Sequence, residues 1–290
     1  MKLILKINLI VAVVYLVAAS VAAYVVNELL LRNAREEIVQ NANIMMEAAS
    51  AVRFYTSTQI NPLLQTQMKY EFPPQSVPAY SANEYFNVLR KNYPEYTYKE
   101  ATLNPTNPRD RATDWEADIV NTFRNTPTTR RLVGERDSQS GRMLYMAIPL
   151  SVTAPTCLEC HSDVAHAPRT MLAKYGEANG FGWQFKEIIG AQIVSVPMDV
   201  AIKRAHDTFR VFLLLLVGLF VFLFLALYLQ LYTQVVRRVR KLAQIADRVS
   251  MGDLEAPEFV ARGNDEIATL ANSFGRMRKS LVQALKMIEG

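Results

Sequence analysis

Two long uncharged segments constrain the fold of this chain more than any other feature of its sequence. Ile7–Val26 reads INLIVAVVYLVAASVAAYVV, and Val211–Tyr232 reads VFLLLLVGLFVFLFLALYLQLY. About 20 apolar residues form a helix that crosses a hydrocarbon core of roughly 30 Å. The second run is apolar on every face, which exceeds what a buried helix of a soluble protein needs. The sequence therefore predicts transmembrane helices at 7–26 and 211–232.

The first run has an alternative interpretation. Lys2 and Lys6 precede it, and the small residues Ala18, Ala19 and Ser20 resemble the cleavage site of a secretory signal peptide. The run is long for the apolar region of such a peptide, and helix-forming sequence continues through it. We expect an uncleaved anchor, with cleavage as the alternative.

The basic residues at the two ends of the chain predict its topology. The formal net charge of +5 lies wholly in residues 1–26 and 233–290, whereas residues 27–210 are neutral overall. Because basic flanks stay on the cytoplasmic side of a membrane, we expect a cytoplasmic N-terminus at 1–6 and a cytoplasmic region at 233–290. Residues 27–210 then form a periplasmic domain of an inner (plasma) membrane protein. The pI of about 9.1 reflects this orientation and does not indicate nucleic-acid binding.

Both cysteines of the chain lie in one motif, Cys157-Leu158-Glu159-Cys160-His161. C-x-x-C-H is the attachment motif of c-type haem, in which two thiols bond to the porphyrin and the adjacent imidazole binds iron. A disulfide or a thioredoxin-type pair leaves the histidine unexplained, and a zinc site needs a fourth ligand. The motif predicts one covalent haem c per chain on Cys157 and Cys160, with His161 as the proximal iron ligand.

The pattern of the exported segment predicts an α+β domain. Residues 27–60 are rich in Ala, Met, Glu and Asn and read as a long helix that leaves the membrane. We expect further helices over 81–92 and 110–125. Two runs with β-branched residues, 142–152 and 187–197, predict strands that flank the haem motif and hold it against a sheet.

Several segments of this domain resemble a family of exported c-type haem sensor domains with a PAS-like fold. The family is common in cyanobacteria and was long catalogued only as a domain of unknown function. The resemblance covers about residues 41–200. It is carried by AVRFYTSTQINPLL (51–64), VPAYSANEYF (77–86), YKEATLNPTNPRDRATDWE (98–116), CLECH with AHAPRTMLAKYGEANGFGW (165–183), and EIIGAQIVSVP (187–197). It implies a PAS-like sheet that carries one covalent haem in a sensory or redox role.

The second axial ligand of the iron stays open at this point. The resemblance implies that some members of the family use a cysteine thiolate as the distal ligand, but this chain has no third cysteine and departs from that pattern. The candidates are Met45, Met46, Met68 and His166, or an open site. We favour a methionine of the 41–55 helix. An open site would bind NO, CO or O₂, whereas Met/His ligation raises the reduction potential.

Other side chains are candidates for the haem surroundings. Arg53 and Tyr55 are candidate partners of the haem propionates or of a distal ligand, because a guanidinium binds a carboxylate through two parallel hydrogen bonds. A surface salt bridge is the alternative for Arg53. Tyr96, Tyr98 and Trp183 are candidate pocket walls, with an ordinary core position as the alternative.

The C-terminal region predicts two amphipathic helices. Apolar residues recur at Val235, Val239, Leu242, Ala246 and Val249, and then at Ile267, Leu270, Phe274, Met277, Leu281, Ala284 and Ile288. Gly252 is expected to end the first helix, and Asn264-Asp265-Glu266 to cap the second. This region resembles a HAMP domain, although the proline often found at its start is missing. The resemblance implies a parallel four-helix bundle built by two chains, hence a homodimer that relays motions of the membrane helices.

Together these features predict a membrane-anchored haem sensor of redox state or of a diatomic gas. No kinase, cyclase or methyl-accepting region follows the HAMP-like segment, so the signal passes to a separate cytoplasmic protein such as a histidine kinase, or the sequence is a fragment. No catalytic constellation is evident, and we do not expect an enzyme. The main alternative is a membrane-anchored electron-transfer cytochrome. A peroxidase would need an open distal site with an acid/base residue.

Overall fold

The computed structural model describes residues 3–68, 70–139, 141–253, 255–259 and 263–289. The first two residues of the predicted N-terminal segment, the last residue of the predicted HAMP region and the side chain of Ile288 lie outside the described residues. The chain divides into two compact units. One comprises Asn27–Asp207, and the other comprises Met1–Val26 together with Thr208–Gly290.

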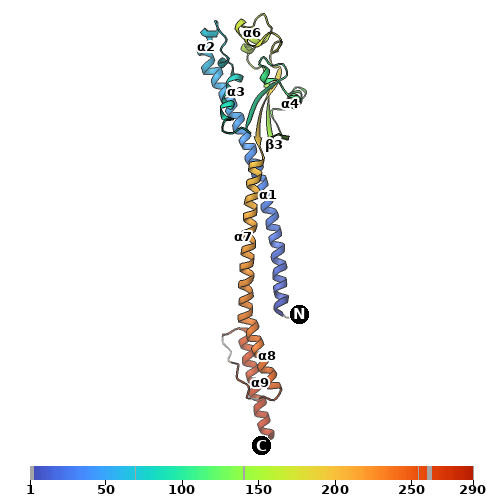
Figure 1. Cartoon of the computed structure of the whole chain (residues 1–290). Coiled ribbons are helices and arrows are strands. Elements are labelled where there is room, and N and C mark those ends of the chain that lie inside the picture. The colour runs from blue at the N-terminus through green and yellow to red at the C-terminus, as the bar shows by residue number, and fades with distance from the viewer. Residues whose placement is uncertain (1–2, 69, 140, 254, 260–262, 290) are drawn as a thin grey trace. The chain divides into compact units, whose positions relative to one another are not determined.

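A four-stranded antiparallel sheet forms the centre of the Asn27–Asp207 unit. Its strands are β1 (Thr97–Thr102), β2 (Leu132–Ser138), β3 (Gly141–Ser151) and β4 (Ile188–Pro197), in the order β1-β4-β3-β2 (Figure 1). The two predicted strands, 142–152 and 187–197, are confirmed as β3 and β4. They pair directly, with Met146 opposite Val194. The strands β1 and β2 were not among the predicted elements.

Helices precede, interrupt and follow the strands of this unit. Helix α1 runs without a break from Leu3 to Tyr55 and continues through a π-helix, Thr56–Ile60, into α2 (Asn61–Met68). The predicted helices over 81–92 and 110–125 are confirmed as α3 (Pro78–Leu89) and α4 (Asp114–Asn125) with shifted boundaries. Two short helices, α5 (Leu158–His161) and α6 (Arg169–Tyr175), lie between β3 and β4.

Helices cover both faces of the sheet because successive strand residues point to opposite sides. The part of α1 that belongs to the Asn27–Asp207 unit, together with Phe86 of α3, packs on one face. The core residues there are Ile38, Ala42, Met45, Met46, Ala49, Tyr98, Leu144, Met146, Val194 and Val196. Helix α4 packs on the other face through Ile119, Val120 and Phe123 (Figure 1). The domain is therefore a mixed helix and sheet structure, as the sequence predicts at this coarser level.

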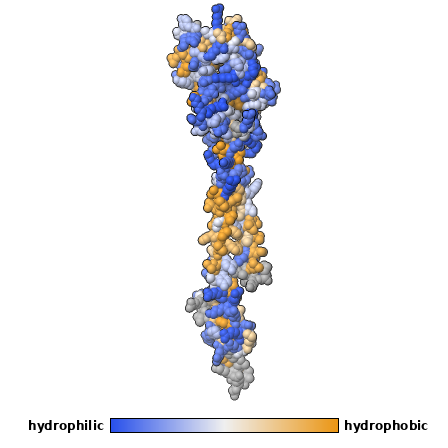
Figure 2. All heavy atoms as spheres, in the orientation of Figure 1, coloured by the Kyte–Doolittle hydropathy of each residue, from blue (hydrophilic) through white to orange (hydrophobic). Residues whose placement is uncertain are grey.

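The second unit contains the apolar helices. Two helical stretches, Leu5–Met68 and Asp199–Ser250, are long and apolar enough to cross a membrane. Figure 2 shows hydrophobic side chains gathered along α1 and along α7 (Asp199–Leu231). Within this unit the Tyr15 hydroxyl donates to the Leu216 carbonyl at 3.0 Å, and the Tyr15 ring lies 3.9 Å from that of Phe220. The two apolar helices thus contact each other at Tyr15.

The C-terminal helices are α8 (Arg237–Ser250), which follows a π-helix at Tyr232–Val236, and α9 (Glu266–Glu289). Gly252, with φ +94°, follows the end of α8 as predicted. Asp265 accepts a hydrogen bond from the Ala268 amide at 2.8 Å and caps α9, also as predicted. Asp265 forms an ion pair with Arg238 as well, and this partner lowers the pKa of its carboxyl group.

The apolar faces of these two helices are only partly covered within one chain. Leu242, Ile245 and Val249 of α8 are buried. The sequence pattern predicts Ala246 between Leu242 and Val249 on the apolar face, but in the structure Ile245 is the buried residue there and Ala246 is only partly buried. Leu270, Met277 and Leu281 of α9 are exposed.

Candidate haem site

The C-x-x-C-H motif lies in the long connection between β3 and β4. The connection is closed at its base, where the Val152 amide donates to the Glu187 carbonyl at 3.0 Å and the Lys186 amide donates to the Val152 carbonyl at 2.9 Å. A turn of 3-10 helix, Pro155–Cys157, leads directly into α5. The sheet therefore anchors the loop at both ends, and the two cysteines and the histidine share consecutive helical turns.

The ring of His161 is held by three contacts. It stacks on Trp183, with 4.0 Å between ring centroids and 16° between planes. Its Nδ1 atom lies 2.7 Å from the Gly180 carbonyl oxygen and 3.3 Å from the Thr106 hydroxyl. Because the carbonyl only accepts, Nδ1 carries the proton and Nε2 keeps its lone pair. Burial lowers the pKa of His161, and the Gly180 hydrogen bond opposes this only in part. The imidazole is thus oriented and neutral, as an iron ligand requires.

Glycine is required at position 180. Its φ is +87°, and a Cβ atom there would lie 2.0 Å from the Thr106 Oγ1 atom and 2.8 Å from the Thr106 Cα atom. Asn104 binds the same loop from β1's side, since its side chain accepts from the Gly180 amide at 3.2 Å and donates to the Phe181 carbonyl at 3.3 Å. These contacts fix the carbonyl that orients His161.

Cys157 and Cys160 carry free thiols and are both half-buried. Cys160 packs against an apolar cluster formed by Phe72, Ala167 and Met171. Burial is the main cause that raises the pKa of Cys160, with smaller contributions from Glu159 and Cys157. Two adjacent thiols and one oriented imidazole are the donor set that covalent haem needs, so the residues present fit this cofactor.

Arg53 lies in the last turn of α1. Its guanidinium forms an ion pair with Glu100, whose side chain is only 2% exposed. Burial lowers the pKa of Arg53, but Glu100, together with smaller contributions from Tyr98 and Cys157, raises that pKa above its ordinary value. Glu100 also accepts a hydrogen bond from the Tyr98 hydroxyl at 2.8 Å. The same hydroxyl lies 3.1 Å from the Gln192 Oε1 atom. The structure therefore gives Arg53 a buried partner inside the domain instead of a surface salt bridge.

The other predicted site residues are dispersed. Met45 and Met46 lie in the core between α1 and the sheet, and Met68 is partly buried at the end of α2. His166 is 72% exposed, and its Nδ1 atom lies 2.7 Å from Asp163. Tyr55 is exposed. The distal ligand stays a prediction.

The three aromatic residues predicted as walls of the haem pocket lie in different places. Trp183 lies against His161. Tyr98 is a core residue whose ring stacks on Phe86 at 4.8 Å, and Tyr96 is partly buried beside the same core.

Four contributors to the site were missed in the sequence: Glu100, Asn104, Thr106 and Gly180. All four lie in segments that carry the family resemblance. A further signal was available for Glu100, an acidic residue between the inward positions Tyr98 and Thr102 of β1. An acid at such a position requires a buried partner.

Comparison with known proteins gives matches to domain families, to curated proteins and to a solved structure. Residues 231–283 match the HAMP domain. The Heme sensor protein HssS of Staphylococcus aureus strains JH9 and Newman is 35% identical over 109 residues, which is 38% of this chain. The match takes in 23% of HssS, so the chain spans about a quarter of the length of these curated relatives. The crystal structure of the cyanobacterial heme-protein Tll0287 covers 56% of this chain and 95% of its own, at 15% identity and a TM-score of 0.44.

The two helices that can cross a membrane, together with the HAMP domain, indicate a membrane-anchored signal transducer. The family match lies in the segment that holds the C-x-x-C-H loop and the sheet. It extends over residues 31–197, more than half of the sequence, and the chain belongs to the Tll0287-like family.

Proposed function

We propose that this chain is a membrane-anchored haem sensor whose periplasmic domain carries one covalent haem c on Cys157 and Cys160. His161 is its proximal ligand. The observation that carries the proposal is the position of His161, whose Nδ1 atom is bound to the Gly180 carbonyl at 2.7 Å beside two free thiols. When bound, haem supplies an iron that changes charge on reduction or binds a diatomic gas such as NO, CO or O₂ at an open axial position.

The HAMP domain favours a sensor over an electron-transfer cytochrome. An electron carrier needs an exposed redox centre and an anchor, whereas a helical relay serves a protein that transmits a change of conformation. The similarity to a protein named as a haem sensor supports the same choice. In this proposal the chain is not an enzyme, both termini are cytoplasmic, and the signal reaches a cytoplasmic output region or partner such as a histidine kinase.

We also propose that the protein is a homodimer through its HAMP domain. Leu270, Met277 and Leu281 recur at heptad spacing on α9 and are exposed within one chain. Exposed apolar residues at this spacing are covered when a second helix packs against them. A parallel bundle of α8 and α9 from two chains supplies that helix.

Covalent haem is tested by expressing the full chain together with a c-type haem maturation system. Haem should stay with the polypeptide on a denaturing gel in the wild-type chain, and Cys157→Ser and Cys160→Ser should each reduce this signal. Glu177→Ala is the matched control, because Glu177 is an exposed residue of the same β3–β4 connection and not a candidate ligand, and it should keep wild-type haem content. A wild-type chain without covalent haem would overturn the proposal. Spectra with and without CO then separate an open site from a six-coordinate redox centre.

Cysteine crosslinking in membranes tests the dimer. Leu270→Cys and Met277→Cys should each give a crosslinked dimer, because equivalent seam positions of a parallel bundle face each other. Lys279→Cys on the exposed surface of α9 is the control and should crosslink much less. Equal crosslinking at all three positions would contradict a defined seam.

A further inference from the structure

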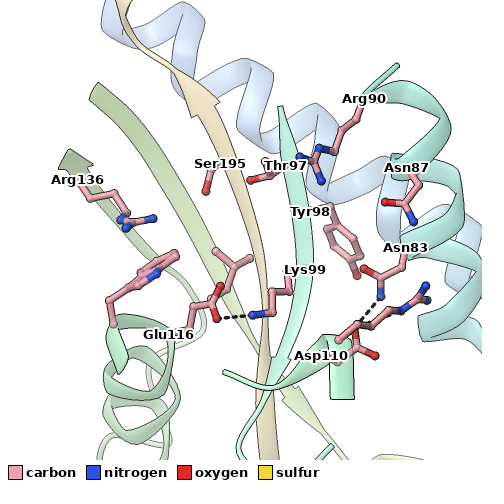
Figure 3. Close-up of a pocket in the computed structure, with 13 residues that line it drawn as sticks. Asn83, Asn87, Arg90, Thr97, Tyr98, Lys99, Asp110, Glu116, Arg136 and Ser195 are labelled. Atoms are coloured by element: carbon pink, nitrogen blue, oxygen red, sulfur yellow. Dashed lines mark hydrogen bonds and ion pairs between the residues drawn. The ribbon is translucent and has the colours of Figure 1, made fainter. Parts of the chain in front are cut away.

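A polar cavity of about 360 Å³ lies beside the edge strand β1, apart from the C-x-x-C-H loop. Figure 3 shows its walls, which come from α3, β1, β4, β2 and the start of α4. A cavity of this size is in the range of small-molecule sites, which are about 300–1,000 Å³. Its lining is mostly polar, so an apolar ligand does not suit it.

Positive charge predominates in this cavity. Four cationic side chains line it, Arg90, Lys99, Arg109 and Arg136, against the two carboxylates of Asp110 and Glu116. Two of the cations are already neutralised. Lys99 is paired with Glu116 at 2.7 Å, and Arg109 with Glu84 of α3 at 2.6 Å.

The two other arginines lack an acidic partner. Within the part of the chain that the structure describes, neither Arg90 nor Arg136 forms an ion pair. Arg136 is held in position all the same, because its guanidinium lies over the Trp115 ring, 4.1 Å from the centroid. Arg90 follows the last residue of α3 as its C-cap. The cavity thus offers two guanidinium groups, one of them fixed by an aromatic ring.

Two hydroxyl groups lie between the arginines. Thr97 and Ser195 are direct register partners on β1 and β4, and Figure 3 shows them between Arg136 and Arg90. Side chains at such paired positions have Cβ atoms about 5 Å apart. Neither hydroxyl makes a hydrogen bond to another of the described residues, although Ser195 is a buried residue. Both are therefore free to donate into the cavity.

Asp110 forms part of the wall on the side of α3. Burial raises the pKa of its carboxyl group to about 6, Arg109 and Lys99 lower it, and Glu100 raises it further. The Asn83 amide faces it at 3.5 Å. This carboxylate lies next to Arg109 and not between the two unpaired arginines, so it leaves the Arg90–Arg136 side of the cavity positively charged.

We propose that this cavity binds a small organic dicarboxylate, with Arg90 and Arg136 each holding one carboxylate and with Thr97 and Ser195 donating hydrogen bonds between them. The two guanidinium groups approach from opposite sides of the β1–β4 pair, which suits an anion charged at both ends better than a compact inorganic ion. Guanidinium groups bind carboxylates through parallel, charge-assisted hydrogen bonds. The proposal does not depend on haem and concerns a second ligand of the same domain.

The probe is succinate, titrated by calorimetry up to about 10 mM into the purified full chain in detergent at low salt. Succinate should bind saturably, and acetate and sulfate should bind at least about tenfold more weakly, because neither carries two separated charges. Arg90→Gln and Arg136→Gln should each weaken succinate binding about tenfold or more, since each removes a charge-assisted contact. The matched control is Arg130→Gln, which removes an exposed arginine of the same domain that does not line the cavity.

Thr97→Val provides a variant that keeps the shape and the strand propensity of the residue but loses the hydroxyl. It should weaken binding several-fold while the absorption spectrum of the haem stays unchanged. The spectrum also separates this proposal from the proposed function, because a chain without haem still tests the cavity. No succinate binding, equal binding of acetate or sulfate, or an equal loss in Arg130→Gln would overturn the proposal.

Discussion

The buried ion pair between Arg53 and Glu100 allows a quantitative prediction about the stability of the Asn27–Asp207 domain. The Glu100 side chain is 2% exposed, and the Arg53 side chain is 25% exposed. If Glu100 is neutralised, the Arg53 guanidinium can still turn towards water. If Arg53 is removed, the Glu100 carboxylate stays buried without a cationic partner. We therefore expect Arg53→Met to destabilise the domain more than Glu100→Gln does.

The magnitude follows from the geometry of the pair. Two unit charges about 4 Å apart attract by about 4 kcal/mol at an effective dielectric constant of about 20. Removal of one member of a buried pair costs about 3–5 kcal/mol. Because the Tyr98 hydroxyl still donates to Glu100 at 2.8 Å, we take about 3 kcal/mol for Arg53→Met. For a domain of this size each kcal/mol lowers the Tm by about 2–4 °C, so the expected loss is about 6–12 °C.

The assay is thermal unfolding of the full chain in detergent, followed by circular dichroism. Arg32→Met is the matched control, because it makes the same substitution on the same helix in an exposed pair with Glu36, whose side chains are 75% and 65% exposed. It should change the free energy of unfolding by no more than about 0.5 kcal/mol. The double variant Arg53→Met/Glu100→Gln removes both charges and should recover at least about 2 kcal/mol of the loss caused by Arg53→Met.

Two results would refute this reasoning. One is a Tm of Arg53→Met within about 2 °C of the Arg32→Met value, which would mean that the pair contributes no more than an exposed one. The other is a double variant that melts no higher than Arg53→Met. In that case the loss would come from the packing of the arginine stem and not from an uncompensated carboxylate.

Three further predictions concern other contacts. Asp110→Asn should stabilise the domain at pH 7.5 by on the order of 1 kcal/mol, because burial raises the pKa of Asp110 to about 6 and so disfavours its ionised form; melts at several pH values should show this gain disappear as the pH falls from 6 towards 4. Gly180→Ala should lower haem content in absorbance measurements, because its Cβ meets Thr106, whereas Gly176→Ala has a similar positive φ but meets no atom within 4 Å and should lower it less. Phe86→Ala should cost about 3–5 kcal/mol in denaturant unfolding and Phe86→Leu less than about 1.5 kcal/mol, because Phe86 is fully buried in the core.

The strands show which part of the fold could be predicted from local sequence. β3 and β4 are rich in apolar residues on both faces, and both were predicted. β1 reads TYKEAT, and its charged residues made a strand difficult to predict. In the structure Lys99 is paired with Glu116 and Glu100 with Arg53, 17 and 47 residues away in the chain. The charges of β1 are tolerated only because of tertiary contacts that no local pattern contains.

The candidate haem site likewise has a part that local sequence predicts and a part that depends on tertiary contacts. Cys157, Cys160 and His161 are recognisable because the chemistry of haem attachment fixes their spacing within one short motif. The groups that orient His161 lie 19 and 55 residues away along the chain, at Gly180 and Thr106, and no spacing rule connects them to the motif. For the same reason the distal ligand could not be chosen from sequence. It depends on which side chain, if any, the fold places opposite His161.

The connections of the Asn27–Asp207 domain suit the relay that we propose. Arg53 lies in the last turn of α1, and α1 is one unbroken helix from Leu3 to Tyr55. β4 ends at Pro197 and α7 begins at Asp199, so a single residue separates the central sheet from the second apolar helix. The Arg53–Glu100 pair joins α1 to β1, and β1 pairs along its whole length with β4. One apolar segment is part of α1 and the other follows β4, and these are the elements that the ion pair and the β1–β4 ladder connect, so the relay that we propose runs along this connection.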